Sequence, residues 1–288
     1  MINLVVLNYN DFETTFHFIS LIKEYNIIDK IIVTDNCSTD DSFEKLCELR
    51  SDKIDVIATP ENKGYASGNN YGVRYALKKY APDYVIISNP DVEFSETMIE
   101  KLYEKAKMID NLGIIASKMN CLSGITLELA WRQPGYLDYL LDYVYPIGKI
   151  RKKARAYQLD NMQEELIQVD VVPGSFLMFA SKAYKDVDGF DERTFLYCEE
   201  DIISAKLKEK GYQNYMLTTE EYIHRHSVSI NKSVSSVKKR LGIRQVSREV
   251  YCRFYLKTGK AKILLLRVFF YLWLCEYLLL TKIRNHRK

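Results

Sequence analysis

The stretch ENKGYASGNNYG, at residues 61–72, lies between two short apolar runs that each end in acidic and small polar residues. The upstream run is IIVTDNCSTDDS, at residues 31–42, and the downstream run is YVIISNPDVEF, at residues 84–94. Short apolar runs bounded by turn residues indicate buried strands. In an open α/β sheet, ligands bind at the carboxyl ends of such strands. Carboxylates beside a glycine-rich turn suit the binding of a base, a ribose and a metal-bridged diphosphate.

Strand and helix patterns alternate outward from this stretch. Alternating strands and helices predict an α/β fold, with a mostly parallel central sheet and helices on both faces. Predicted strands cover residues 4–7, 30–34, 54–58, 84–88, 112–117 and 169–179, and predicted helices cover residues 12–25, 41–49, 67–79 and 97–108.

The glycines of the central stretch are spaced four apart, at Gly64, Gly68 and Gly72. This spacing would let a helix pack closely on the sheet. It is not the GxGxxG pattern, so a dinucleotide-binding fold is not indicated.

Asp35 and Asn36 end the second predicted strand. Together they can accept a hydrogen bond from a pyrimidine N3–H and bind a ribose hydroxyl. Asp and Asn also favour helix N-caps, but Ser38 and Asp40 can fill that role here. Base recognition is therefore the preferred interpretation of this pair.

A second motif, DGFDERTFLYCEED, spans residues 188–201, and Gly211 and Tyr212 follow it. The adjacent carboxylates Glu199, Glu200 and Asp201 repel one another, which raises at least one pKa and suits a general base. The alternative is an acidic cluster stabilised by a helix N-terminus.

Taken in order, these motifs resemble those of the inverting glycosyltransferases of family 2, which have the GT-A (Rossmann-like) fold, and in particular rhamnosyltransferase-like members that build surface polysaccharides. The resemblance covers roughly residues 2–230. It implies transfer of rhamnose or a hexose by a single displacement. The donor would be a dTDP- or UDP-linked sugar, and the acceptor would be a glycan or a polyprenyl-linked hydroxyl.

The resemblance also implies roles for individual residues. Asn89-Pro90-Asp91 takes the position of the family's Asp-x-Asp motif, so Asp91 would hold Mn²⁺ or Mg²⁺. His224, twelve residues beyond Tyr212, matches a histidine that completes the metal or diphosphate site. The residues expected to bind the nucleotide-sugar are Asn8, Asp35, Asn36, Asn62, Gly64, Asn70 and Asn89.

The family pattern Tyr-x-Glu-Asp-x-Asp-Leu can be aligned without gaps from Tyr197. This alignment puts Glu199 on the glutamate and Glu200 on the catalytic aspartate. Ile202 and Lys206 depart from the pattern. Glu200 is therefore the predicted base, with Asp201 as the alternative.

The last 58 residues are basic. Residues 231–288 hold 15 lysines and arginines against two acids, a net charge of +13, whereas residues 1–230 hold 26 against 36, a net charge of −10. A basic segment on an acidic domain suggests an anionic partner surface. Residues 263–280 are apolar except for Arg267 and Glu276. This segment could lie on a membrane, pack on the domain or a partner, or span a bilayer.

These patterns divide the chain into a GT-A domain at residues 1–230 and a basic, amphipathic helical, membrane-associating segment at residues 231–288. Residues 1–117 would bind the nucleotide-sugar and residues 118–230 the acceptor. Residues 132–165 interrupt the strand–helix alternation, and a lid loop and a peripheral helical hairpin are both compatible with them.

Six scattered cysteines without a CxxC pair indicate reduced thiols. The first residues lack the features of a signal peptide. We therefore expect a cytoplasmic protein, peripheral on the inner face of the membrane.

Two alternative functions can be compared with the features of this sequence. A sugar-phosphate nucleotidyltransferase needs a glycine-rich basic loop after its first strand, where this chain has Asn8-Tyr9-Asn10-Asp11. A nucleic-acid-binding tail is compatible with the charge and with the aromatic residues at 251–255. The apolar run at residues 263–280 does not suit a nucleic-acid groove, so no nucleic-acid partner is expected.

Overall fold

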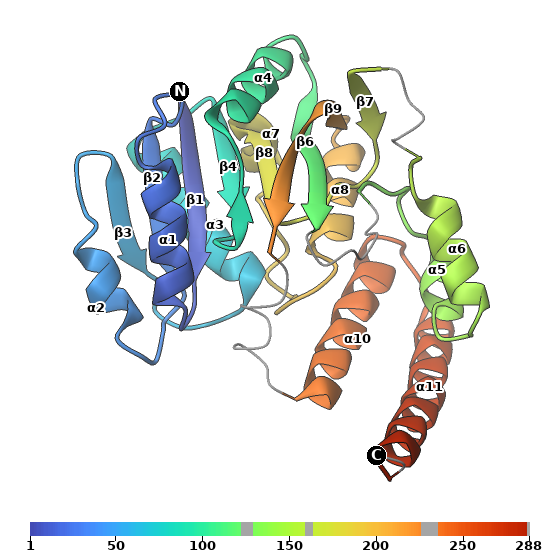
Figure 1. Ribbon diagram of the computed structural model, residues 1–288. Helices are drawn as coiled ribbons and strands as arrows, with labels where there is room; N and C mark the ends of the chain where they lie inside the picture. The colour runs from blue at the N-terminus through green and yellow to red at the C-terminus, as the bar shows by residue number, and fades with distance from the viewer. Residues whose placement is uncertain (122–128, 159–163, 226–235, 287–288) are drawn as a thin grey trace.

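The computed structural model describes residues 1–121, 129–158, 164–225 and 236–286, and the side chains as far as residue 281. Its centre is a nine-stranded sheet in the order β3-β2-β1-β4-β8-β6-β9-β5, with β7 paired to β9 (Figure 1). The pairings give β1, β2, β3, β4, β6 and β9 one direction and β5, β7 and β8 the opposite one. The predicted mostly parallel α/β sheet is confirmed.

The strands lie close to the predicted runs. Their bounds are β1 Ile2–Asn8, β2 Lys30–Asp35, β3 Ile54–Ala58, β4 Tyr84–Ser88, β5 Val92–Glu93, β6 Leu112–Cys121, β7 Leu166–Val169, β8 Phe176–Ala180 and β9 Gln213–His224. The single strand predicted at residues 169–179 is wrong, because β7 ends at Val169 and β8 begins at Phe176. Pro173 and Gly174 lie in this break, and proline cannot donate a ladder hydrogen bond.

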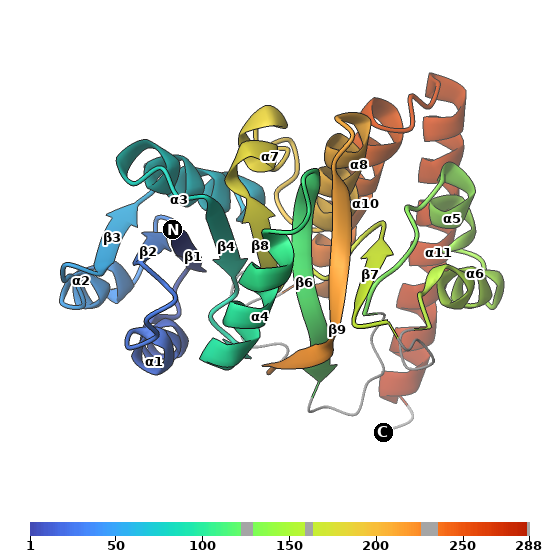
Figure 2. The ribbon, with the colours of Figure 1, turned by 90° about the horizontal axis from the view of Figure 1, so that it is seen from above.

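The helices cover both faces of the sheet (Figure 2). Their bounds are α1 Phe12–Ile22, α2 Ser42–Cys47, α3 Tyr65–Lys79, α4 Glu96–Ala106, α5 Tyr136–Leu141, α6 Ile147–Arg155, α7 Ser181–Asp186, α8 Glu199–Glu209, α10 Val237–Phe254 and α11 Lys260–His286. Helices α1, α2 and α4 lie on one face, and α3, α7 and α8 on the other.

Strand β1 shows why helices pack on both faces of the sheet. Leu4 and Val6 belong to the core beneath α1 and α4, and Val5 belongs to the core beneath α3. Successive side chains of a strand point to opposite faces, so an all-apolar strand is buried on both. The three side chains have no solvent exposure.

Helix α3 packs unusually close to the sheet. A Cβ on Gly68 would lie 2.6 Å from Leu7 Cδ1, and one on Gly72 would lie 2.3 Å from Thr34 Oγ1. The four-residue spacing of the glycines thus allows α3 to pack closely on the sheet, as the sequence suggested. This approach brings the N-terminus of α3 to the carboxyl ends of β1 and β2.

A third core joins the C-terminal helices to the α5–α6 hairpin. Tyr143 packs edge-on against Phe270 and at a tilt against Trp273 of α11, and Tyr139 packs edge-on against Tyr251 of α10. The irregular segment at residues 132–165 therefore contains a helical hairpin in its described part. Residues 159–163 of that prediction lie outside the described residues.

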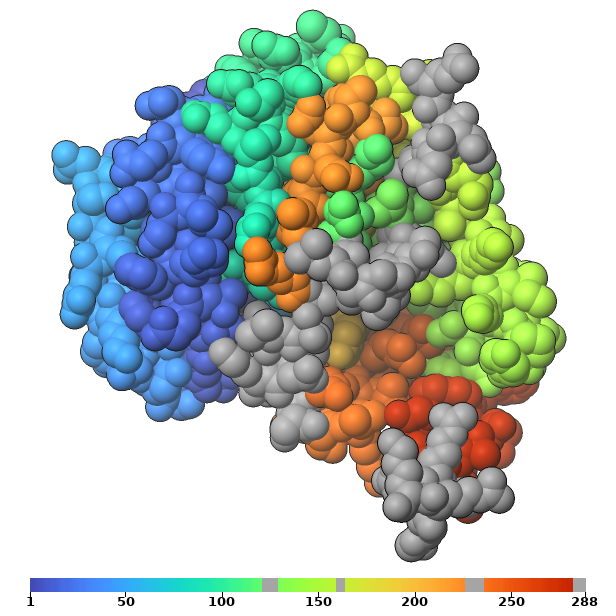
Figure 3. All heavy atoms as spheres, viewed as in Figure 1, coloured from blue at the N-terminus to red at the C-terminus, as the bar shows by residue number. Residues whose placement is uncertain are grey.

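Helix α11 has two unlike faces. Leu266 and Phe270 are buried in the third core, whereas Leu264, Tyr271 and Leu272 are each more than 60% exposed. Residues 260–281 are long and apolar enough to cross a membrane by length and composition, and this is weak evidence for a span. In Figure 3 this helix projects from one end of the molecule beside the hairpin.

Candidate active site

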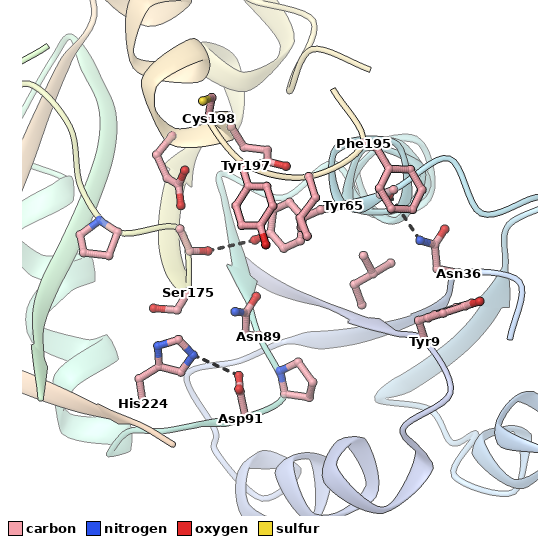
Figure 4. A pocket seen from close by; sticks show the side chains of 18 of the residues that line it. Tyr9, Asn36, Tyr65, Asn89, Asp91, Ser175, Phe195, Tyr197, Cys198 and His224 are labelled. Atoms are coloured by element: carbon pink, nitrogen blue, oxygen red, sulfur yellow. Dashed lines mark hydrogen bonds and ion pairs between the residues drawn. The ribbon is translucent and has the colours of Figure 1, made fainter. Parts of the chain in front are cut away.

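A cavity of about 350 Å³ opens at the carboxyl ends of β1, β2 and β4, beside the N-terminus of α8 (Figure 4). Asp91 and His224 lie at one end and Tyr9 and Asn36 at another, with Tyr197 across from them. The predicted site residues that line it are Asn36, Asn62, Gly64, Asn89, Asp91, Glu199, Glu200 and His224.

Asn36 and Asn62 form a hydrogen-bonded polar wall. Asn36 Nδ2 donates to Asn62 Oδ1 at 3.1 Å, and the Gly64 N–H donates to the same oxygen at 2.9 Å. Thr59 Oγ1 donates to Asn36 Oδ1 at 3.2 Å. These bonds hold both amide groups in one orientation at the cavity surface.

Asp35 and Asn8 lie directly behind this wall and do not line the cavity. Asn8 Nδ2 donates to Asp35 Oδ2 at 2.8 Å, and Thr15 donates to Asn8 Oδ1. Asp35 also accepts from the Ser38 N–H at 2.8 Å and from the Ser38 hydroxyl. Both side chains are fully used in shaping the turn after β2.

Asn70 lies away from the cavity, on the buried side of α3. Its Nδ2 donates to Phe190 O and to Glu192 Oε1, both at 2.9 Å, and Tyr184 donates to its Oδ1. Asn70 thus joins α3 to residues 190–192. Its amide is fully used there, so the predicted nucleotide-sugar contact has no support from its position.

Gly64 brings the two halves of the site together. Its φ is +97°, and a Cβ would lie 2.0 Å from Phe195 O, which accepts from the Tyr65 N–H at 2.9 Å. Any other residue would meet both a left-handed backbone and a backbone clash. The glycine therefore fixes the contact between the loop before α3 and the loop before α8.

Asp91 and His224 form a carboxylate–imidazole pair at one end of the cavity. His224 Nε2 lies 3.2 Å from Asp91 Oδ1, and both side chains are less than a tenth exposed. β5 pairs with the end of β9, with Val92 opposite His224, which sets this contact. Asn89 is held close by, since its N–H donates to Ser175 O at 2.9 Å.

These two side chains fit a divalent cation that is completed by substrate. Within the described residues there is no cluster of three or more His, Cys, Asp or Glu side chains arranged to hold a metal. Mg²⁺ and similar hard cations are commonly held by one or two carboxylates together with water and substrate phosphates. Asp91 with His224 matches that kind of site, and does not match an all-protein cage.

Glu199 and Glu200 line the same cavity from the first turn of α8. The two residues before them, Tyr197 and Cys198, have φ of 76° and 65°. Left-handed backbone is uncommon and costly for residues other than glycine, and such strain concentrates at functional sites. Gly174 leaves room for Glu200, because a Cβ there would lie 2.6 Å from Glu200 Oε1.

The electrostatics of the pair favour proton uptake. Burial raises the pKa of Glu199, the neighbouring Glu200 charge raises it further, and Glu199 Oε1 is buried without a hydrogen-bond partner in the described structure. Burial also raises the pKa of Glu200, and the backbone amides of Glu200 and Gly174 oppose that rise. Both carboxyls are thus more basic than ordinary glutamates.

Asp201 points elsewhere. Trp131 Nε1 donates to Asp201 Oδ1 at 2.8 Å, and the Tyr139 hydroxyl donates to Oδ2. This carboxylate does not line the cavity and instead ties α8 to the segment that leads into α5. Its geometry is that of a residue that positions α8.

Several cavity residues were not predicted from the sequence. They are Leu7, Tyr9, Asp11, Tyr65, Pro90, Met119, Pro173, Gly174, Ser175, Phe195, Leu196, Tyr197 and Cys198. The Pro-Gly-Ser break at residues 173–175 was the one available signal, because it interrupts an apolar run.

The fold and the cavity are those of an α/β enzyme whose polar site lies at the carboxyl ends of parallel strands. The model of the glycosyl transferase family 2 matches residues 4–188, so the chain belongs to that family and is a glycosyltransferase. The family resemblance found in the sequence is confirmed. The nucleotidyltransferase and nucleic-acid-binding alternatives have no support.

Curated relatives have low identity to this chain. An N-acetylglucosaminyl-diphospho-decaprenol L-rhamnosyltransferase of Mycobacterium tuberculosis is 23% identical over 214 residues, which cover 72% of this chain and 69% of the relative. The low-salt glycan biosynthesis hexosyltransferase Agl10 of Haloferax volcanii is 24% identical over 246 residues, covering 84% and 73%. The rhamnosyltransferase WbbL of Escherichia coli is 24% identical over 168 residues, covering 56% and 60%.

Solved structures share the fold. The mannosyltransferase PcManGT from Pyrobaculum calidifontis, in complex with GDP-Man and Mn²⁺, is similar with a TM-score of 0.59 at 12% identity, covering 93% of this chain and 69% of that one. Residues 1–349 of TarS from S. aureus, with UDP-GlcNAc, give a TM-score of 0.51 at 15% identity, covering 93% and 71%. The predicted GT-A fold is thus confirmed.

Proposed function

We propose that this glycosyltransferase moves rhamnose or a hexose from a nucleotide diphosphate-sugar to a hydroxyl of a glycan or polyprenyl-linked acceptor, in the synthesis of a cell-surface polysaccharide. The observation that carries this proposal is the cavity itself, which Glu200 lines together with the Asp91–His224 pair. The names of the curated relatives support the sugar and acceptor classes.

The donor binds along the polar wall. Asn36 and Asn62 present oriented amides for a pyrimidine base and ribose, with Asp35 holding the turn from behind. The N-terminus of α3, which begins directly after Gly64, favours the negative diphosphate. A dTDP- or UDP-linked sugar fits these groups.

Asp91 and His224 hold the cation, Mn²⁺ or Mg²⁺. A bound divalent ion would neutralise the charge that develops on the leaving diphosphate. The buried position of both side chains supports this role, because a carboxylate in such surroundings attracts a cation strongly.

Glu200 acts as the general base. The acceptor oxygen attacks the anomeric carbon, its proton passes to Glu200, and the bond from that carbon to the diphosphate oxygen breaks with inversion. Glu199 lies beside it and shares the low-polarity surroundings that raise both pKa values. Asp201 serves as a positioning residue through Trp131 and Tyr139.

The C-terminal segment places this site on the cytoplasmic face of an anionic membrane. The +13 charge of residues 231–288 and the exposed apolar side of α11 support attachment. Each basic residue near such a surface contributes about 1 kcal/mol. On this proposal, residues 1–230 carry the transferase site and residues 231–288 carry the attachment.

A donor panel tests the proposal directly. Purified full-length protein is incubated with UDP-, dTDP- and GDP-sugars, with Mn²⁺ or with EDTA, and release of the nucleoside diphosphate is measured. We expect metal-dependent release from at least one dTDP- or UDP-linked sugar. Metal-independent release, or no binding of any of these donors, would refute the proposed chemistry.

A further inference from the structure

A row of arginines lies on α10 behind the catalytic wall. Arg240, Arg244 and Arg248 are spaced four apart, so they share one side of the helix and rise by about 6 Å per step. Ser247, on the same helix, donates to Leu196 O at 2.8 Å. Because Leu196 lines the cavity, α10 forms the outer support of that wall.

The guanidiniums of Arg244 and Arg248 are not fully compensated by carboxylates of the described residues. Arg248 pairs with Asp142 and lies between the rings of Tyr139 and Tyr143, but its Nη1 is buried without a hydrogen-bond partner in the described structure. Arg244 has no carboxylate at ion-pair distance within the described residues. Its guanidinium carbon instead lies 5.9 Å from the centroid of the Trp273 ring.

Arg244 is held in an environment that disfavours an uncompensated charge. Burial lowers the pKa of Arg244 first and the neighbouring Arg248 charge lowers it further, and the charge of Asp142 offsets this only in part. A guanidinium remains charged under all ordinary conditions. An anion bound at this point would therefore remove a standing electrostatic penalty.

The row also lies between the cavity and the apolar helix. Burial raises the pKa of Tyr197, which lines the cavity, and the positive charges of Arg240 and Arg244 oppose that rise. On the other side, Trp273 belongs to α11 and stacks on Tyr277. Figures 1 and 2 show α10 next to α11.

We propose that Arg244, with Arg240 and Arg248, binds the diphosphate group of a lipid-linked acceptor, whose chain follows α11 and whose sugar enters the cavity. This inference rests on the proposed function and names the acceptor site within it. Arginine suits the role because its planar fork binds phosphate oxygens in pairs. The aromatic side chains of α11 suit the boundary between a phosphate head and an apolar chain.

The test measures binding and does not depend on turnover. Quenching of tryptophan fluorescence is followed in the full chain as farnesyl diphosphate, farnesol or inorganic pyrophosphate is added. Trp273 next to Arg244 is one of only two tryptophans. We expect farnesyl diphosphate to bind more tightly than either other probe, and UDP or dTDP affinity is measured in parallel.

Three variants make the result specific. Arg244→Gln is expected to weaken farnesyl diphosphate by roughly ten- to a hundredfold, the range for a lost charge-assisted hydrogen bond, and to leave UDP and dTDP affinity unchanged. Arg244→Lys keeps the charge without the fork and is expected to give an intermediate loss. Lys238→Gln, an exposed change outside the arginine row of α10, is the control and is expected to bind normally.

The opposing outcomes are distinct. Unchanged farnesyl diphosphate binding in both Arg244 variants would overturn the proposal. Equal loss of nucleotide affinity would assign the arginine to the donor, and equal binding of pyrophosphate would assign it to free anions, and each result overturns the lipid-linked acceptor. Wild-type protein that binds farnesyl diphosphate but no nucleotide would instead refute the proposed function.

Discussion

Gly64 and Phe195 touch through their backbones, although 131 positions separate them. Gly64 has a φ of +97°, and a Cβ on it would lie 2.0 Å from the carbonyl oxygen of Phe195. The same oxygen accepts from the Tyr65 N–H. The absence of a side chain at Gly64 therefore lets two loops pack directly against each other. One loop carries the polar wall, and the other leads to Glu199 and Glu200.

This contact predicts a specific defect. Gly64→Ala should separate the two loops and remove nucleotide affinity, because the new Cβ meets a backbone atom that cannot move aside alone. Gly211→Ala is the matched control, since its φ is +84° but nothing lies within 4 Å of the added Cβ. The control should carry only the backbone cost of about 1–2 kcal/mol. Isothermal titration with UDP or dTDP measures the first effect and thermal unfolding the second. Equal behaviour of the two variants would refute the steric argument.

Glu200→Gln should keep donor affinity and lose transfer by roughly 10²–10⁴-fold, the range for removal of a general base. Asp201→Asn should retain more activity, because its carboxylate faces Trp131 and Tyr139 and not the cavity. Single-turnover transfer rates and donor titrations on both variants check this. If Asp201→Asn is the inactive variant, the assigned base is wrong by one position.

Asp91→Ala should abolish the metal-dependent part of UDP or dTDP binding and leave the far-UV circular dichroism unchanged. Glu93→Ala is the control, because Glu93 lies two residues away and pairs with Arg225. Titrations with Mn²⁺ and with EDTA separate the two contributions. A nucleotide affinity that is unchanged by EDTA and by the Asp91 substitution would contradict the metal assignment.

Glu199→Gln should stabilise the protein more at higher pH. Burial raises the pKa of Glu199 in the folded state above that of the unfolded chain. The folded state therefore holds a proton that the unfolded state releases, and wild-type stability falls as pH rises through that interval. Glutamine removes this dependence. Urea unfolding of both proteins at pH 5 and pH 8 measures the difference, and a stability gap that does not widen at pH 8 would contradict the raised pKa.

The exposed side of α11 should mediate membrane attachment. Deleting the helix would also expose the core around Leu266 and Phe270, so substitutions on the outer side are the cleaner test. A Leu272→Asp, Leu279→Asp double variant should leave anionic vesicles in a flotation assay. Met108→Asp, which changes a still more exposed apolar residue after α4, should not. Wild-type protein that fails to float at low salt would exclude the membrane role.

The sequence by itself was sufficient for the fold and for the main polar residues of the cavity. Buried strands such as β1 and β2 are read from continuous apolar runs, and parallel strands bring their carboxyl ends to one edge of a sheet. Asn36, Asn62, Asn89 and Asp91 could therefore be assigned to one site, because each follows a strand or precedes a helix at that edge.

Tertiary structure decided which of the polar residues face that site. Asp35, Asn8 and Asn70 have the same chemistry as their neighbours, but their hydrogen bonds are used inside the protein. Glu200 and Asp201 are adjacent in sequence, and only the helical rotation of about 100° per residue separates a cavity side chain from one bonded to Trp131. Local pattern cannot reveal such differences, because they depend on partners from distant segments.

The arginine row shows the same division. Its four-residue spacing is visible in the sequence, and a basic tail was expected from the net charge of +13. That Asp142 pairs with Arg248, and that Arg244 lies against Trp273 of α11, required the packing of α5, α10 and α11. Charge can be counted along a chain, but compensation of charge is a property of three-dimensional contacts.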